Sequence, residues 1–306
     1  MNLLKRKLDV IATLALLGAV LCWSVVPLFL KYFTGFIDSW TANGIRYPFA
    51  ALLYLPILFY FRKRGNFPVR VWKLALLPAL INIFSQTCWA SAPYFIDPGL
   101  MAFLVRLSTL WIVIISFIVF ADERVLIHSK GFWLGFVFAV GGFIAMTLGR
   151  ETALGGATTT GILLVVMTSI FWAGYQIMVR KNMQRVDSRI AFGAIAQITS
   201  IGLLGFMFAF GKPEQALAIP LSVTVLVLIS GVIGIAAAHV LYYVAIKRVG
   251  VAIASSTSLV SAFLTAILSR FLFDERLTHV QWVAGFGLVV GGILLTRAQT
   301  HLRIKK

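Results

Sequence analysis

Apolar residues occur along this chain in ten long runs, and short polar stretches separate each run from the next. A bilayer core of about 30 Å requires about 20 residues of helix to cross it. Each run is close to that length, so the sequence predicts ten transmembrane helices, five in each half. We place them at residues 10–33, 41–61, 72–93, 98–120, 130–149, 158–179, 190–210, 220–246, 250–273 and 280–297.

The polar positions show that the two halves are copies of each other. Phe120 to Arg124 reads Phe-Ala-Asp-Glu-Arg, and Phe273 to Arg276 reads Phe-Asp-Glu-Arg. The same residues then follow in the same order in each half, a Trp and a Gly pair: Trp133 with Gly141-Gly142, and Trp282 with Gly291-Gly292. We therefore expect two domains, residues 1–150 and 151–306, each one repeat of five helices.

An odd number of helices in each copy requires the two copies to insert in opposite orientations. The predicted fold is an all-α membrane protein of two inverted five-helix repeats. Secondary transporters are often built in this way and bind substrate between the repeats, near the middle of the membrane. The alternative is a duplicated scaffold that transports nothing.

Composition and charge agree with a membrane protein. Hydrophobic residues make up 60% of the chain and charged residues only 12%, whereas soluble proteins average about 25% charged residues. Cytoplasmic loops are rich in Lys and Arg, and an inside N-terminus places twenty of the 27 basic residues on the cytoplasmic side. We therefore expect a multi-pass protein of the plasma (inner) membrane with both termini cytoplasmic. Its net charge of +17 then reflects topology and contact with anionic lipid, and not nucleic-acid binding.

The sequence gives no indication of an enzyme, a cofactor or a metal site. It contains no phosphate-binding loop, dinucleotide-binding motif or zinc-protease motif, and its four His and two Cys lie far apart. The basic residues Lys5 to Lys7 precede an apolar run, as in a signal peptide, but that run is too long and has no cleavage site of small residues. We expect this run to be the first transmembrane helix.

The order of these features resembles the drug/metabolite transporter superfamily, in its EamA family. The resemblance covers nearly the whole chain and rests on the repeated Glu-Arg motifs, the Trp and Gly pairs, Arg46 in Gly-Ile-Arg-Tyr, and Ala245 to Gly250 (Ala-Ile-Lys-Arg-Val-Gly). It implies export of small metabolites such as amino acids. It also implies a proline within the fourth and ninth helices, but Leu107 to Trp111 and Ser261 to Leu264 contain none, so a proline hinge is not expected there.

Ionisable and polar residues inside the predicted spans are the candidate substrate-binding residues. A charged residue at a helix centre costs about 2.5–3.5 kcal/mol on insertion and commonly faces a cavity. Arg106 is expected at roughly 12 Å depth, from the helical rise per residue. An offset of 153 residues pairs Gln86 with His239 and Trp89 with Tyr242, so these four are expected to line two symmetric walls of one cavity. Each could instead serve only helix packing.

Four further residues complete the candidate site. Trp23 and Trp172 lie deep in their spans and could stack on cargo or pack in the core. Lys31 and Arg46, together with Arg106, would make the outer half of the pathway cationic. Arginine suits a carboxylate or phosphate through paired hydrogen bonds. The best prediction is export of a small polar metabolite, an amino acid or related organic anion, by alternating access.

The ten acidic residues all lie in loops or at the ends of spans. Ion-coupled pumps commonly keep a carboxylate inside the membrane, so we expect facilitated or weakly coupled transport, with His239 as the one candidate for proton coupling. Two alternatives to export remain. One is uptake or exchange of phosphorylated or nucleotide-linked metabolites, and the other is a non-transporting sensor or assembly factor.

The repeated Gly pairs and Asp-Glu-Arg motifs are expected to have structural roles. The Gly pairs would pack helices closely, within a rigid frame or a homodimer surface. The Asp-Glu-Arg motifs would tie helix ends together.

Overall fold

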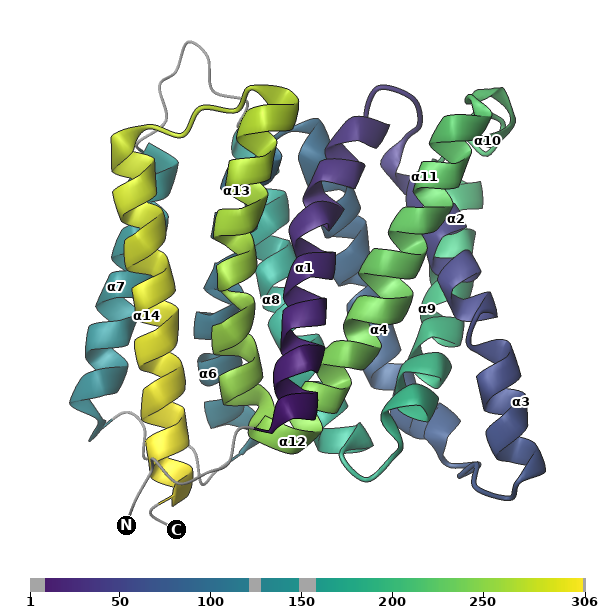
Figure 1. Cartoon of the computed structure of the whole chain (residues 1–306), viewed down its shortest axis with the longest axis horizontal. Coiled ribbons are helices and arrows are strands. Elements are labelled where there is room, and N and C mark those ends of the chain that lie inside the picture. Colours follow the sequence, from purple (N-terminus) through teal and green to yellow (C-terminus); the bar gives the residue numbers. More distant parts are fainter. Residues whose placement is uncertain (1–8, 121–127, 149–157, 305–306) are drawn as a thin grey trace.

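The computed structural model describes residues 9–120, 128–148 and 158–304, and these fold into a bundle of helices without a strand (Figure 1). A helix satisfies its own backbone hydrogen bonds, which is what a lipid environment requires of a spanning segment. The first half contains α1 (Val10–Phe33), α2 (Ser39–Leu52), α3 (Leu55–Lys63), α4 (Val71–Ser91), η2 (Ala92–Tyr94), α5 (Pro98–Leu104), η3 (Val105–Leu107), α6 (Ser108–Val119) and α7 (Lys130–Leu148). The second half contains α8 (Thr159–Met183), α9 (Ser188–Phe210), α10 (Gln215–Ala218), α11 (Leu221–Gly231), η5 (Val232–Ala237), α12 (Ala238–Ser258), α13 (Val260–Phe273) and α14 (His279–Ile304).

Seven helical segments in the described part of the chain are long and apolar enough to cross a membrane. They are Val10–Phe33, Ser39–Lys63, Val71–Tyr94, Pro98–Val119, Thr159–Met183, Ser188–Phe210 and Leu221–Arg248. Three shorter apolar helices, Lys130–Met146, Val260–Phe273 and His279–Leu295, occupy the positions of the other expected spans. The protein is therefore an all-helical, multi-pass membrane protein, and the count of ten crossings stays a prediction.

Several expected spans are not single regular helices. The span expected at 41–61 divides into α2 and α3 just before Pro56, because proline has no backbone N–H to bond to the carbonyl four residues earlier but is tolerated in the first turn of a helix. The span expected at 98–120 contains a 3₁₀ turn at Val105–Leu107 between α5 and α6. The span expected at 220–246 contains a π-helical turn at Val232–Ala237.

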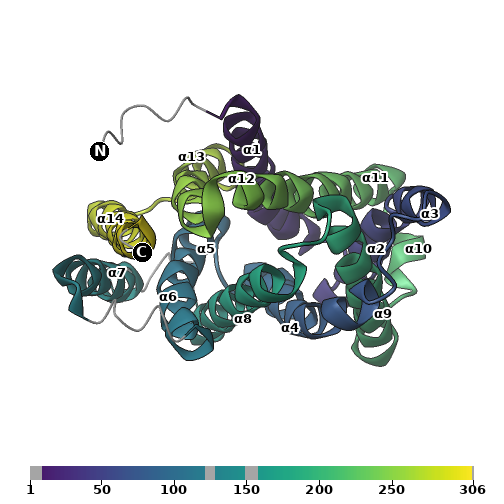
Figure 2. The same ribbon diagram turned by 90° about the horizontal axis from the view of Figure 1, so that it is seen from below.

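The bundle has two opposite faces. Helix α1 begins and α14 ends at the lower face in Figure 1, which we call the terminal face, whereas the connection from α1 to α2 lies at the upper face, which we call the opposite face. Seen from below (Figure 2), α7 and α14 form a pair at one edge of the bundle.

The main helix–helix contacts are symmetric between the two halves of the chain. Helices α7 and α14 pack together, as do α5 and α13, and α2 and α9, and each of these pairs joins corresponding spans of the two copies. Helix α1 packs on α12, and its counterpart α8 packs on α4. This is the pattern expected of two halves related by a two-fold axis. Exchanging the halves leaves the first three pairs unchanged and converts the α1–α12 pair into the α8–α4 pair.

The pair α7 and α14 approaches closely at Gly135, Gly142 and Gly291. A Cβ atom at Gly142 would lie 2.6 Å from the backbone nitrogen of Leu288, and one at Gly291 would lie 2.4 Å from that of Ala139. Gly141, in contrast, has nothing within 4 Å of such a Cβ position. The expected close packing is thus confirmed for one glycine of each pair.

Candidate functional site

Arg46, on α2, is buried with only 1% of its surface exposed. Its Nε donates a hydrogen bond to Oγ of Ser230 on α11 (2.8 Å), and its Nη1 donates to Oδ1 of Asn43 (3.3 Å). The structure gives no partner to Nη2 among the described residues. Arg46 therefore joins the two halves through neutral acceptors and keeps part of its guanidinium group available.

Arg106 lies in the 3₁₀ turn between α5 and α6. Its Nε donates to the carbonyl of Ala102 (3.2 Å), and its Nη2 and Nη1 donate to the hydroxyls of Ser261 (2.9 Å) and Ser258 (3.5 Å). These serines belong to the second half. Among the described residues no carboxylate pairs with Arg46 or Arg106, so both positive charges are held by neutral groups.

His239 follows the π-helical turn, at the start of α12, and is 3% exposed. Its Nδ1 lies 3.1 Å from the carbonyl oxygen of Ile235, and its Nε2 has no hydrogen-bond partner within the described part of the chain. The imidazole packs edge-on against Trp23 and Trp172, with centroids 5.8 and 5.4 Å away, and stacks on Phe192 at 5.4 Å. Three aromatic rings thus fix the plane of the imidazole.

Tyr242 lies one helical turn after His239. Its hydroxyl donates to Oε1 of Gln176 on α8 (3.0 Å), and its ring contacts that of Trp23 at a centroid distance of 4.8 Å. The side-chain amide of Gln86 lies near Oδ1 of Asn82 (3.4 Å), while its backbone carbonyl accepts from Asn43 (2.7 Å). These contacts link α4 to α2, and α12 to α1 and α8.

All of these groups meet at one cavity inside the bundle. Eight of the nine residues expected to bind substrate line it: Trp23, Arg46, Gln86, Trp89, Arg106, Trp172, His239 and Tyr242. The lining comes from both halves of the chain and, among the described residues, includes no Asp or Glu. The arrangement combines two guanidinium groups, an imidazole, amides and aromatic rings, which suits a small anionic or zwitterionic molecule.

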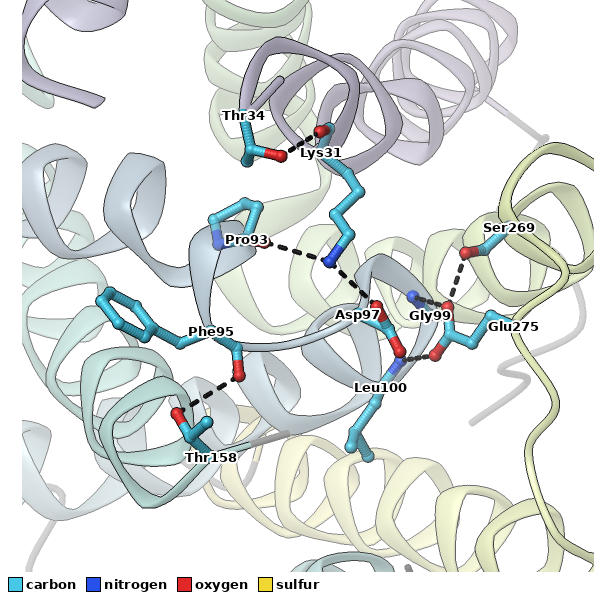
Figure 3. Close-up of polar contacts among 10 residues, drawn as sticks. All are labelled: Lys31, Thr34, Pro93, Phe95, Asp97, Gly99, Leu100, Thr158, Ser269 and Glu275. Carbon is cyan, nitrogen blue, oxygen red and sulfur yellow. Dashed lines mark hydrogen bonds and ion pairs between the residues drawn. The ribbon is translucent and has the colours of Figure 1, made fainter. Parts of the chain in front are cut away.

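Lys31, the ninth expected residue, is not among the residues that line this cavity. Its Nζ forms an ion pair with Asp97 (3.0 Å) and donates to the carbonyl of Pro93 (3.2 Å), at the opposite face (Figure 3). Asp97 compensates its charge, so Lys31 does not add to the unpaired positive charge of the cavity. Of the three basic residues expected in the pathway, Arg46 and Arg106 line the cavity and Lys31 does not.

Glu275, in the second Asp-Glu-Arg motif, joins the two halves near Lys31 (Figure 3). Its carboxylate accepts hydrogen bonds from the backbone nitrogens of Gly99 (2.7 Å) and Leu100 (2.8 Å) at the start of α5, and from Ser269 Oγ (2.5 Å). Burial raises the pKa of Glu275, although these three hydrogen bonds lower it. The motif thus ties helix ends together as expected, whereas the first copy, Asp122 to Arg124, lies outside the described residues.

The sequence did not identify several polar residues that line the cavity. They are Ser85, Ser108, Thr109, Thr168, Gln176 and Ser258. Small hydroxyl residues are common in transmembrane helices, where they bond to their own backbone, as Thr168 does to the carbonyl of Leu164 (2.8 Å). Only the polarity of Gln176 within an apolar span could have indicated a role.

Comparison with known proteins identifies relatives across nearly the whole chain. The EamA-like transporter family matches twice, over residues 10–148 and 159–298. An "Uncharacterized transporter" of Haemophilus influenzae is 23% identical over 185 residues, 60% of this chain and 60% of that protein. A second "Uncharacterized transporter", of Methanothermobacter thermautotrophicus, is 22% identical over 194 residues, 63% of this chain and 54% of the relative.

The fold also has a solved counterpart. A crystal structure that shares 18% sequence identity superimposes with a TM-score of 0.66, over 95% of this chain and 98% of the other. The superposition shows that the two chains share a fold. The alignments with the two curated transporters span 60% and 54% of their lengths.

Proposed function

Because this chain belongs to the EamA-like transporter family, we propose that it exports a small amino acid or related organic anion by alternating access of its two repeats. The observation that carries this proposal is the pair of arginines, the buried Arg46 and the half-buried Arg106, which line one cavity with only neutral hydrogen-bond partners. The protein acts as a secondary transporter in the plasma (inner) membrane.

The charge of the cavity supports an anionic group on the cargo. A buried charge without a partner of opposite sign is unfavourable, because the protein interior solvates it less well than water does. A ligand carboxylate would supply the missing negative charge and accept paired hydrogen bonds from a planar guanidinium group. Cationic drugs lack this complementarity, since no acidic residue of the described chain lines the cavity.

The distribution of Lys and Arg supports the orientation. Basic residues lie at the end of α3, Arg62 to Arg64, and at the end of the apolar span Leu221–Arg248, Lys247-Arg248, both at the terminal face. Cytoplasmic segments keep such residues. The terminal face is then cytoplasmic. Cargo would leave the cell when the cavity opens at the opposite face.

The absence of an acidic side chain from the described cavity lining supports facilitated or weakly coupled transport. His239 is the one candidate for proton coupling among the residues that line it. Efflux from proteoliposomes should therefore lose any response to an imposed pH gradient in His239→Ala. A gradient response that persists in this variant would contradict the assignment.

A ligand-stabilisation screen tests the class of cargo. A molecule that binds the native state raises the melting temperature by mass action, so amino acids, organic acids, phosphorylated metabolites and cationic dyes can be compared on purified protein. We expect a shift with an amino acid or organic anion that disappears in Arg106→Gln and persists in the exposed control Arg185→Gln.

Other outcomes of this screen point to the alternatives. A shift with phosphorylated metabolites alone would favour uptake or exchange of such anions. A shift with cationic dyes alone, or with no class of compound, would contradict the proposal, and the latter would favour a non-transporting sensor or assembly factor.

A further inference from the structure

Two buried polar atoms of the cavity-lining residues, Oγ of Ser85 and Nε2 of His239, have no hydrogen-bond partner within the described part of the chain. Of these, only the imidazole nitrogen of His239 is a pure acceptor when the proton is on Nδ1. Nδ1 of His239 lies 3.1 Å from the carbonyl oxygen of Ile235. Because a carbonyl can only accept, this contact requires the proton on Nδ1. In the neutral imidazole Nε2 is then a hydrogen-bond acceptor, and it has no hydrogen-bond partner among the described residues.

The surroundings of His239 favour this neutral form. The charged residues that line the cavity are Arg46 and Arg106, and no carboxylate of the described residues faces it. A protonated imidazole would add a third positive charge to a site that already lacks negative charge. His239 therefore presents a lone pair where the arginines present only donors.

The position of Nε2 is fixed by the backbone as well as by aromatic packing. The π-helical turn before His239 carries the acceptor carbonyl of Ile235, and the next carbonyl, of Ala236, accepts a hydrogen bond from the hydroxyl of Tyr54 (2.9 Å). A Cβ at Gly234 would lie 2.5 Å from Val26, so this turn packs closely on α1. Turns of the π type occur frequently at functional sites.

The groups beside Nε2 suit a small cation that forms part of the ligand. Trp23 and Tyr242 contact each other (4.8 Å), and Trp23 contacts Trp172 (5.8 Å), around the imidazole. Aromatic faces attract an ammonium group without the need for a carboxylate. The cavity therefore offers two kinds of recognition, donors for an anion and an acceptor with aromatic rings for an amine.

We propose, on the basis of the function proposed above, that His239 is a specificity-determining residue that selects amino acids over simple carboxylates. Its Nε2 accepts a hydrogen bond from the ammonium group of the cargo, while Arg46 and Arg106 bind the carboxylate. A carboxylate without an amino group leaves Nε2 unpaired in a buried site, and sites of this kind discriminate strongly against the analogue that lacks the donor.

Matched pairs of ligands test this inference by isothermal titration of the purified, full-length protein. The pairs are L-leucine with 4-methylpentanoate, L-phenylalanine with 3-phenylpropanoate, and L-glutamate with glutarate. We expect the wild-type protein to bind the amino acid of at least one pair about tenfold or more tightly than its partner, since a hydrogen bond to a charged group has about that effect.

Two substitutions of His239 distinguish the effect of losing the hydrogen-bond acceptor from the effect of changing the size of the side chain. His239→Met removes the acceptor and keeps the length, and should bring the ratio of the two affinities close to one while the carboxylate still binds. His239→Gln keeps an acceptor oxygen at the end of the side chain and should retain part of the preference. Melting of each unliganded variant checks that it is folded, and the Gln variant provides the test if the Met variant is not.

The results distinguish this inference from the proposed function. Equal binding of both members of every pair to the wild-type protein, with loss of both in Arg106→Gln, would overturn the role of His239 alone, as would an unchanged ratio in His239→Met. Tight binding of 2-hydroxy-4-methylpentanoate, equal to that of L-leucine, would overturn the ammonium assignment. Failure of every pair to bind, or binding unaffected by Arg106→Gln, would overturn the proposed function as well.

Discussion

Two arginines with neutral partners, Arg46 and Arg106, carry the positive charge of the cavity. Arg46 bonds to Ser230 and Arg106 to Ser261, so each arginine of the first half is held by a hydroxyl of the second. Serine keeps the guanidinium in place without cancelling its charge, whereas an Asp or Glu at the same position would form an ion pair and reduce the attraction for an anion. Both guanidinium groups therefore keep their positive charge for the carboxylate that the proposed cargo carries.

Glu275 differs from the two arginines, because its carboxylate is used for hydrogen bonds that join the two halves of the protein. Glu275→Ala would remove the acceptor for the Gly99 and Leu100 backbone nitrogens and for Ser269. A buried donor without an acceptor costs about 1–3 kcal/mol. We expect a lower melting temperature for this variant in detergent, while the exposed control Glu214→Ala melts like the wild-type protein. Equal melting of the two variants would contradict the role of Glu275 as a link between the halves.

The sequence predicts some site residues better than others for a physical reason. Arg106 and His239 stand out because ionisable residues are rare inside apolar spans, and Gln86 and Trp89 follow from the repeat. Lys31 lies at the end of its span, where its long side chain can reach either the pathway or a nearby acid, and the nearness of Asp97 (3.0 Å) depends on folding. Hydroxyl residues give no such signal.

Helices α7 and α14 depend on their glycines. Gly142→Ala would place a Cβ 2.6 Å from the backbone nitrogen of Leu288, and an overpacked core residue costs about 1–3 kcal/mol. Gly141→Ala adds the same methyl group where nothing lies within 4 Å and should leave the melting temperature unchanged or slightly higher, since Ala favours helix. Comparable melting of both variants would show that α7 and α14 do not pack in this way.

The positions and types of the helices could be predicted, whereas their irregular turns could not. The division of α2 from α3 lies just before Pro56 and α5 begins at Pro98, both of which are local sequence signals. The 3₁₀ turn at Arg106 and the π-helical turn before His239 contain no proline. They are accompanied by side-chain hydrogen bonds to backbone carbonyls, from Arg106 to Ala102, from His239 to Ile235 and from Tyr54 to Ala236. The last of these joins the two halves of the chain and depends on the tertiary structure.

The pairing of the two halves accounts for how one cavity receives residues from both. Helix α1 packs on α12, and α8 packs on α4. Trp23 on α1 and Trp172 on α8 correspond in the two copies, and their rings contact each other at a centroid distance of 5.8 Å. The duplication visible in the sequence predicts which positions of the two halves correspond. It could not predict the direction in which each side chain points.

The orientation of the whole molecule can be tested with fusions at its C-terminus. Fluorescent protein folds in the cytoplasm, and alkaline phosphatase is active only outside it. The excess of Lys and Arg at the terminal face predicts a fluorescent fusion and an inactive phosphatase fusion. Active phosphatase at the C-terminus would contradict the proposed orientation.

Transport by the reconstituted protein tests the central claim most directly. Proteoliposomes loaded with a radiolabelled amino acid that stabilises the wild-type protein should release it faster than liposomes without protein, and Arg106→Gln should reduce this release to the background rate, whereas Arg185→Gln should not. Release that is equally fast with Arg106→Gln would contradict the account, because the cargo would then cross without the cavity arginine.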